Sequence, residues 1–325
     1  MIGDMQKWTP NVAGIIEHAR EIHPKTEIIS RLVSGEIHRS NYEKVCIRSR
    51  KLASALEKDG VKKGDVIATL ALNTYRHLEM YYGISGMGAI THTLNFRLHP
   101  EQAVYIINHA EDKIIFVELP FVPILEALQE NLKTVEKYVV LCEVDEMPET
   151  TLKNAISYEE YIQDGDENYS WPTLEDDAAC ALCYTSGTTG NPKGVLYSHK
   201  SNVIHAQAAL TAMTIKPDDT ILMVVPLFHV LAWGIPYFGP MNGLKLVMPG
   251  MQMEGEPLFE LIDQEDVTLA FGVPTIWMGL LAYCRDNNKI LSSVKNTIIG
   301  GSALSLATLQ AVSYTHLTLP TIITV

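Results

Sequence analysis

Short apolar segments alternate with segments of helical period over residues 40–141. This alternation is the sequence feature that most restricts which fold the chain can adopt. Apolar runs of strand length occupy 66–72, 89–94, 113–117 and 138–141. Helical spacing of apolar residues covers 40–60, 73–87 and 100–110. Strand, helix and strand repeated in this order predict an α/β fold with a parallel-rich sheet and helices on both of its faces.

Local signals place the ends of these helices. Ser40 with Glu43 has the pattern of a capping box, and Gly60 ends the segment. Asn73 is of a residue type that caps a following helix, and Pro100 suits a first helical turn.

The alternation resumes after an acidic, irregular stretch at 148–177, which we interpret as a surface connection near a boundary between two subdomains. The later predicted strands are 178–184, 195–198, 220–225, 245–248, 267–271 and 296–299. The later predicted helices are 201–215, 257–265 and 275–286.

Composition excludes several classes of protein. The chain of 325 residues is 47% hydrophobic and carries a net charge of −13, so it is neither a disordered chain nor a binder of nucleic-acid backbones. Its five cysteines are too few and too scattered for a disulfide framework, which favours a reducing compartment. Cys180 and Cys183 spell C-x-x-C inside an apolar strand, where two core thiols are favoured over a metal or redox site.

A membrane span is also disfavoured. Residues 221–244 lack Lys, Arg, Asp and Glu, but Pro226, Pro236 and Pro240 would break the helix that a bilayer demands. The N-terminus lacks a basic region and an apolar core of the signal-peptide type.

The segment 184–195 reads YTSGTTGNPKGV and joins two predicted strands. Residues 185–194 hold four hydroxyl side chains, three glycines and one lysine. Glycines let backbone N–H groups approach an anion, hydroxyls donate to phosphate oxygens, and Lys193 adds positive charge. The loop is not of the Walker type, because Pro192 and Gly194 replace the required glycine and hydroxyl. A phosphate loop and a plain hairpin loop rich in turn residues are both compatible with these residues.

The same segment resembles the phosphate-loop signature of the adenylate-forming (AMP-binding) superfamily. Further resemblance follows in order at 226–230 (PLFHV), 271–275 (FGVPT) and 300–303 (GGSA). Other segments are similar to bacterial medium- to long-chain fatty-acid CoA ligases: 37–39 (IHR), 73–77 (NTYRH), 85–89 (SGMGA), 105–110 (YIINHA) and 232–234 (AWG). The resemblance implies that residues 1–311 form the large N-terminal domain of the adenylate-forming fold, and that this domain is incomplete.

What the resemblance implies chemically is activation of a carboxylic acid in two steps. A carboxylate attacks the α-phosphate of ATP to give acyl-AMP, and the thiol of coenzyme A then displaces AMP, with Mg²⁺ relieving charge at the phosphates. By the same resemblance the polyphosphate is held by Thr185, Ser186, Gly187, Thr188, Thr189 and Lys193, and Thr185 is a magnesium ligand.

Further site residues come from the other matching segments. A lone histidine in an apolar segment is more often a core residue, but the resemblance places His229 beside the acyl carboxylate as a catalytic residue. Trp233 is by default a core aromatic, and the resemblance makes it a gate of the fatty-acid tunnel. Leu231 departs from the Asn of many relatives. Two further groups follow by resemblance: an adenine wall of Gly300, Gly301, Ser302 and Ala303, and a tunnel border of Val273, Pro274 and Thr275.

The resemblance stops after Leu309. Residues 312–325 have no helical period and look like translated sequencing adapter, so we interpret them as a non-native tail. The family's downstream magnesium-binding glutamate, ribose-binding aspartate and C-terminal lid domain have no counterpart in the chain. We therefore expect a fragment that binds ATP weakly, does not turn over and is poorly soluble.

The leading hypothesis is an ATP-dependent fatty-acid CoA ligase of the cytoplasm. Its substrate would be a medium- to long-chain fatty acid. An adenylate-forming enzyme of an aryl or other carboxylic-acid branch and a non-catalytic nucleotide or acyl binder remain as alternatives, and a homodimer and peripheral contact with a membrane stay open.

Overall fold

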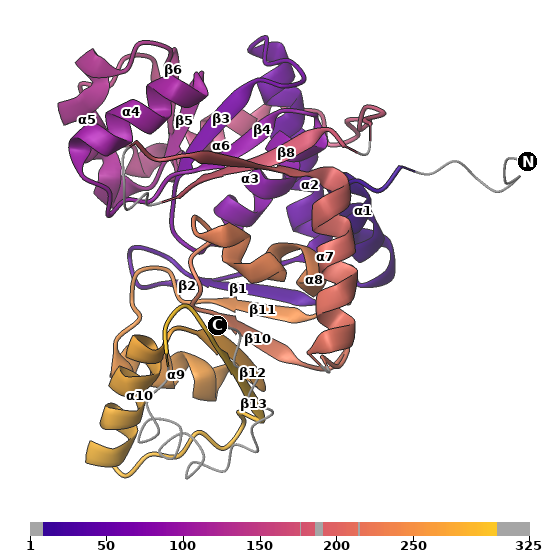
Figure 1. Cartoon of the computed structure of the whole chain (residues 1–325), viewed down its shortest axis with the longest axis vertical. Helices are drawn as coiled ribbons and strands as arrows, with labels where there is room; N and C mark the ends of the chain where they lie inside the picture. Colours follow the sequence, from indigo (N-terminus) through magenta and orange to yellow (C-terminus); the bar gives the residue numbers. More distant parts are fainter. Residues whose placement is uncertain (1–8, 176, 186–190, 214, 304–325) are drawn as a thin grey trace, which may run out of the picture.

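The computed structural model describes residues 9–175, 177–185, 191–213 and 215–303. Two β-sheets stand one above the other in Figure 1, with helices between them and on their outer faces. The α/β class predicted from the sequence is confirmed.

The upper sheet in Figure 1 has seven strands in the order β7-β6-β5-β3-β4-β8-β9. All of its neighbours run parallel except the β8–β9 pair, which forms an antiparallel hairpin at one edge. Its strands are β3 Val66–Leu70, β4 Ile90–Thr93, β5 Ile114–Val117, β6 Lys137–Val140, β7 Ala155–Ser157, β8 Ala179–Tyr184 and β9 Gly194–Ser198.

The lower sheet has six strands in the order β13-β12-β10-β11-β1-β2, parallel except for the β1–β2 pair. Its strands are β1 Glu27–Arg31, β2 Ile37–Asn41, β10 Thr220–Met223, β11 Lys245–Met248, β12 Leu269–Gly272 and β13 Asn296–Ile299. Parallel strands buried on both faces are apolar throughout, which explains why their short apolar runs were predictable.

Helices form three layers around the two sheets. The α-helices are α1 Val12–Ile22, α2 Tyr42–Lys58, α3 Tyr75–Gly86, α4 Pro100–Ala110, α5 Val122–Leu128, α6 Tyr158–Gln163, α7 His199–Ala212, α8 Ile235–Met241, α9 Gly255–Gln264 and α10 Pro274–Asp286. Short 3₁₀ turns are η1 Leu119–Phe121, η2 Gln129–Asn131, η3 Val144–Glu146 and η4 Val230–Gly234.

Four apolar clusters mark how these layers pack. Helices α4 and α5 cover one face of the upper sheet, and α2, α3 and α6 cover the other. Helices α1, α3, α7 and α8 fill the space between the two sheets, while α9 and α10 cover the far face of the lower sheet. The middle layer therefore contacts both sheets, and α3 belongs to it.

The structure differs from the sequence prediction at the segment 148–177. This segment contains β7 and α6 and is not a wholly irregular connection. The strands before and after it, β6 and β8, belong to the same sheet, so the predicted boundary does not coincide with the division between sheets. The lower sheet instead takes β1 and β2 from the N-terminal end of the chain, and these strands and α1 were not predicted.

Two predicted helix caps were also wrong. Asn41, not Ser40, caps α2, with its side chain accepting a hydrogen bond from the Lys44 N–H at 2.9 Å. Thr74, not Asn73, stands at the start of α3. Asn73 uses its amide elsewhere, as described below.

The apolar segment 221–244 is an interior segment, as predicted. It forms β10, η4 and α8, and most of its side chains are buried. In the part of the chain that the structure describes, no helix is long and apolar enough to cross a bilayer.

Both residues of the C-x-x-C pattern are buried free thiols in β8. Burial raises the pKa of Cys180 to about 12, which keeps this thiol protonated and unreactive at neutral pH.

Candidate functional site

Three neighbouring strands of the lower sheet deliver the sequence-predicted residues to one edge. β10, β12 and β13 are adjacent and parallel, so their carboxyl ends lie side by side. The segment 226–233 follows β10, 273–275 follows β12 and 300–303 follows β13. Open α/β sheets bind ligands in such places, outside the carboxyl ends of their strands.

Close packing joins these three segments. A Cβ atom built on Gly300 would lie 2.9 Å from Cη2 of Trp233, so the indole ring lies directly against the glycine backbone. Gly301 has a φ of +83°, and a Cβ atom there would lie 3.2 Å from Cγ1 of Val273. Both positions therefore require glycine, one for the close approach and one for its backbone conformation.

The remaining residues of these segments differ in exposure. Val273 is half-buried and precedes α10, Pro274 is buried in its first turn, and Thr275 is exposed. Ser302 and Ala303 are exposed beyond β13.

The hairpin β8–β9 carries the described ends of the predicted phosphate loop. Tyr184 pairs with Gly194, and the Thr185 N–H donates to the Lys193 carbonyl at 2.9 Å. The side chains of Thr185 and Lys193 are both exposed at the end of this hairpin. Ser186, Gly187, Thr188 and Thr189 lie outside the described residues.

Thr93, at the end of β4, links the hairpin to the segment after β10. Its Oγ1 lies 3.3 Å from Sγ of Cys183 in β8, and it donates to the Phe228 carbonyl at 3.3 Å. Thr93 therefore connects the strand that leads into the predicted phosphate loop with the residue that precedes His229.

His229 is exposed, so it is not a core histidine. Its backbone N–H donates to the Pro226 carbonyl at 3.0 Å, which closes a turn. Phe228 is buried and meets the ring of Phe96 edge-on, with 5.0 Å between the ring centroids. One aromatic residue thus anchors the turn in the interior and leaves the imidazole outside.

A left-handed turn follows His229. Val230, Leu231, Ala232 and Trp233 have φ values of 45°, 49°, 47° and 56°, and Gly234 has 82°. A left-handed conformation costs about 1–2 kcal/mol for each residue other than glycine. Strain of this kind persists where the surrounding structure fixes it, and it concentrates at functional sites. Apart from Gly234, nothing in the sequence indicates this turn.

Tyr184 is fixed by two histidines at the base of the loop. Its hydroxyl lies 2.6 Å from Nδ1 of His109, and its ring packs against His92 with 5.1 Å between centroids. Burial raises the pKa of Tyr184 to about 12, so the phenol is neutral. His92 is itself buried and paired with Asp112, with 2.8 Å between Nδ1 and the carboxylate.

Two further features bear on ligands. Among the described residues, no group of three or more His, Cys, Asp or Glu side chains is placed to hold a metal ion.

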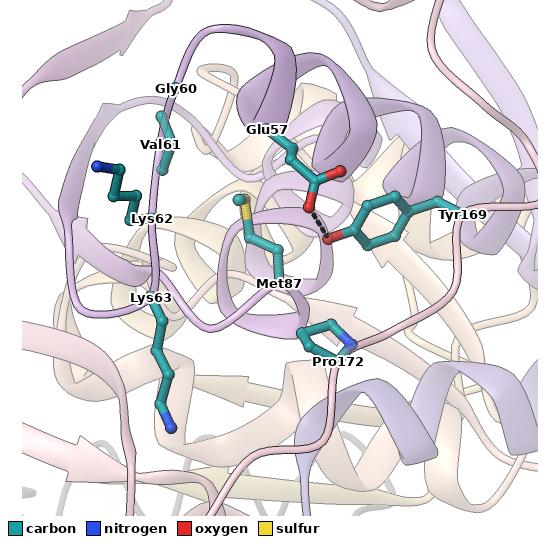
Figure 2. A pocket seen from close by; sticks show the side chains of 8 residues that line it. All are labelled: Glu57, Gly60, Val61, Lys62, Lys63, Met87, Tyr169 and Pro172. Atoms are coloured by element: carbon teal, nitrogen blue, oxygen red, sulfur yellow. Dashed lines mark hydrogen bonds between the residues drawn. The ribbon is translucent and has the colours of Figure 1, made fainter.

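An open cavity of about 400 Å³ lies beside Lys62, Lys63 and Tyr169 (Figure 2). None of the predicted site residues lines it, so it is separate from the site described above.

Sequence reasoning missed the residues that hold the site together. Asn73, Tyr81 and Thr93 bond to the backbone of 223–228, as analysed below. Asn73 lies within the matching segment NTYRH, so the segment was noticed, but nothing in it shows a partner 150 residues away.

The chain belongs to the AMP-binding enzyme family, whose model matches residues 16–322. The Medium-chain-fatty-acid–CoA ligase of Ectopseudomonas oleovorans is 45% identical over 305 residues, 93% of this chain and 56% of that protein. The 3-methylmercaptopropionyl-CoA ligase of Ruegeria lacuscaerulensis is 44% identical over 305 residues, again 93% of this chain, and 57% of that protein. The chain thus spans little more than half the length of these relatives.

A likeness to a solved structure supports the fold. The crystal structure of a long-chain-fatty-acid-CoA ligase (FadD1) from Archaeoglobus fulgidus matches with a TM-score of 0.83 at 23% identity. The match covers 97% of this chain and 63% of that one. The predicted membership of the adenylate-forming superfamily and the predicted fold are both confirmed.

Proposed function

We propose that the complete gene product is an ATP-dependent CoA ligase for a medium- to long-chain fatty acid. The observation that carries this proposal is the link through Thr93 between two elements: the hairpin that carries Lys193 and the segment that carries His229. The 45% identical relative named as a medium-chain fatty-acid CoA ligase supports the substrate class.

The proposal assigns the polyphosphate of ATP to the loop 185–193. Thr185 and Lys193 are exposed at its two ends. An ammonium group and hydroxyls suit phosphate oxygens. Ser186, Gly187, Thr188 and Thr189 complete the proposed loop.

A magnesium ion suits the hydroxyl oxygen of Thr185. Mg²⁺ prefers oxygen ligands, keeps several waters and takes most of its remaining ligands from the phosphates of the substrate. The exposed Thr185 hydroxyl is the protein oxygen that we assign to it. When bound, the ion would neutralise charge on the phosphates.

The proposal places the reacting carboxylate near His229. This exposed imidazole stands on a turn anchored by Phe228, so it can donate a hydrogen bond to an oxygen at the reacting centre without moving the backbone. We assign the adenine to Gly300, Gly301, Ser302 and Ala303, a segment that is exposed at Ser302 and Ala303 beyond the end of β13.

The fatty-acid chain is assigned to the space bordered by Trp233, Val273, Pro274 and Thr275. Trp233 packs against Gly300, so the assigned adenine wall and the assigned acyl border share one contact. Coenzyme A is the proposed second substrate, because its thiol can displace AMP from acyl-AMP. We also place the protein in the cytoplasm, where ATP and coenzyme A are supplied.

The test is pyrophosphate release by the complete gene product with ATP and a panel of acids. We expect octanoate to palmitate to be activated and benzoate and amino acids to be inactive. A preference for 3-methylmercaptopropionate, the acid of the 44% identical relative's product, would move the protein to that branch. Saturable ATP binding without acyl-AMP would instead indicate a non-catalytic binder.

Two further measurements complete the proposal. Light scattering after size-exclusion chromatography determines whether the protein forms a homodimer. Flotation with lipid vesicles determines whether it contacts a membrane surface peripherally.

A further inference from the structure

The segment that leads from β10 to His229 contains a proline shortly after the strand ends. β10 ends at Met223, and Pro226 has no N–H to donate to a strand ladder. The backbone groups of 223–228 therefore need partners other than a neighbouring strand, because buried groups without partners cost free energy.

Asn73 supplies three of these partners. Its amide nitrogen donates to the Met223 carbonyl at 2.7 Å and to the Val225 carbonyl at 2.8 Å. Its amide oxygen accepts from the Leu227 N–H at 2.8 Å. An asparagine amide offers two N–H donors and one carbonyl oxygen, and all three functions are used here on one segment.

Two more side chains continue the pattern toward His229. The Tyr81 hydroxyl donates to the Leu227 carbonyl, and Thr93 Oγ1 donates to the Phe228 carbonyl. Tyr81 lies on α3, which begins two residues after Asn73, and Thr93 ends β4. Side chains from Asn73, α3 and β4 thus bond five backbone groups between Met223 and Phe228.

Asn73 is in turn held by its neighbours. The Leu72 N–H donates to the buried Glu118 carboxylate at 3.1 Å, and Nδ1 of His77 lies 2.9 Å from the Leu72 carbonyl. The Tyr75 N–H donates to Ser30 of β1 at 2.9 Å. The chain on both sides of Asn73 is therefore fixed to both sheets, so its amide has a defined position.

We propose that Asn73 is a positioning residue that sets the backbone carrying Phe228 and His229 for attack of the carboxylate on ATP. This inference rests on the proposed function and adds to it a residue that does not touch substrate. Misplacement of a reacting group by about 1 Å is enough to cost about 100-fold in rate.

The test compares Asn73→Asp with a matched control, Asn202→Asp. The two asparagines are equally buried, with 6% and 5% of their surfaces exposed. At position 73 an oxygen would replace the nitrogen and face two carbonyl oxygens, so the segment must move. Asn202 bonds Sγ of Cys180 at 3.0 Å in the packing between α7 and β8, a bond that does not involve the backbone of 223–228.

In the complete gene product we expect Asn73→Asp to lower kcat for acyl-AMP formation by about 10- to 100-fold, with KM for ATP changed less than about threefold. We expect faster backbone hydrogen exchange in peptides covering 223–229. Asn202→Asp should leave both quantities unchanged, whatever stability it loses. Equal kcat losses in the two variants, or unchanged exchange at 223–229 in Asn73→Asp, would overturn the proposal.

A second pair keeps the test decisive if Asn73→Asp does not fold. Tyr81→Phe removes the bond to Leu227, while Tyr82→Phe removes a similar bond to the Pro236 carbonyl beyond the turn. Both tyrosines are fully buried on α3. We expect lower kcat only in Tyr81→Phe, and equal effects would count against the proposal. If the unmodified protein formed no acyl-AMP, the proposed function would fall, and the exchange data would decide by themselves whether Asn73 holds the segment.

Discussion

At the scale of the residue, Asn73 shows how far a sequence can be interpreted. The same amide can cap a helix or bridge two distant strands, and both uses are chemically reasonable. The choice is made by Met223, Val225 and Leu227, which reach Asn73 only in the folded chain. His229 and Lys193 were predicted because their neighbours form an unusual pattern, whereas Asn73 has no such local signature.

Glu118 gives a prediction at the same scale. Burial raises its pKa from 4.5 to about 7, against the effect of the hydrogen bond from Leu72. Between these two values the folded protein retains a proton that the unfolded chain has lost. The free energy of unfolding contributed by this group therefore falls as the pH rises from about 4.5 to 7.

Replacing the carboxyl by an amide removes this titration. As the pH rises from 4.5 to 8, we expect the free energy of unfolding of Glu118→Gln to increase by about 3 kcal/mol relative to that of the unmodified protein. Urea denaturation of both proteins at several pH values measures the difference. If the plots of unfolding free energy against pH were parallel for the two proteins across this range, Glu118 would not titrate in the folded state as described.

At the scale of the element, the left-handed turn η4 requires the least favourable backbone conformation of its residues. Gly234 ends it with a φ of 82°, and a Cβ atom there would lie 2.5 Å from Nδ1 of His205. Because His205 is exposed and its ring can move, the cost comes mainly from the backbone conformation.

Gly234→Ala should therefore lower the free energy of unfolding by about 1–2 kcal/mol. Gly279→Ala is the matched control, since Gly279 lies in α10 with nothing within 4 Å of its Cβ position. Alanine favours a helix interior over glycine by about 1 kcal/mol, so this variant should be unchanged or more stable. Thermal denaturation compares the two, and equal losses would contradict the account of η4.

The elements differ in how well the sequence predicted them, for a physical reason. β3, β5 and β12 are buried on both faces and therefore appear as plain apolar runs. β2 lies at a sheet edge and reads IHRSN, so it carries no such run. β7 has only three residues, too few for any period to show. The left-handed turn could not be predicted, since four of its five residues are not glycine.

At the scale of the whole molecule, the exposed edge of the β8–β9 hairpin predicts a tendency of the chain to aggregate. β9 is the last strand of its sheet, and its side chains Val195 and Leu196 are 40% and 60% exposed. An exposed apolar edge strand offers unpaired backbone groups to another chain and promotes aggregation.

Leu196→Lys should raise the concentration at which the 325-residue chain begins to scatter light. Ile290→Lys is the control, because Ile290 is 59% exposed but lies outside the sheets. It adds the same charge without blocking an edge. Equal improvement from both variants would show that net charge, and not the β9 edge, governs solubility.

The central claim for the whole molecule is that the loop ending at Lys193 holds the polyphosphate of a nucleotide. The most direct test is pyrophosphate release by the complete gene product with Lys193→Ala, beside Lys62→Ala. Lys62 is an exposed lysine before β3, at the strand ends opposite to those from which the loop extends. The account predicts a loss of about 100-fold or more for Lys193→Ala and no change for Lys62→Ala. An undiminished rate in Lys193→Ala would contradict it.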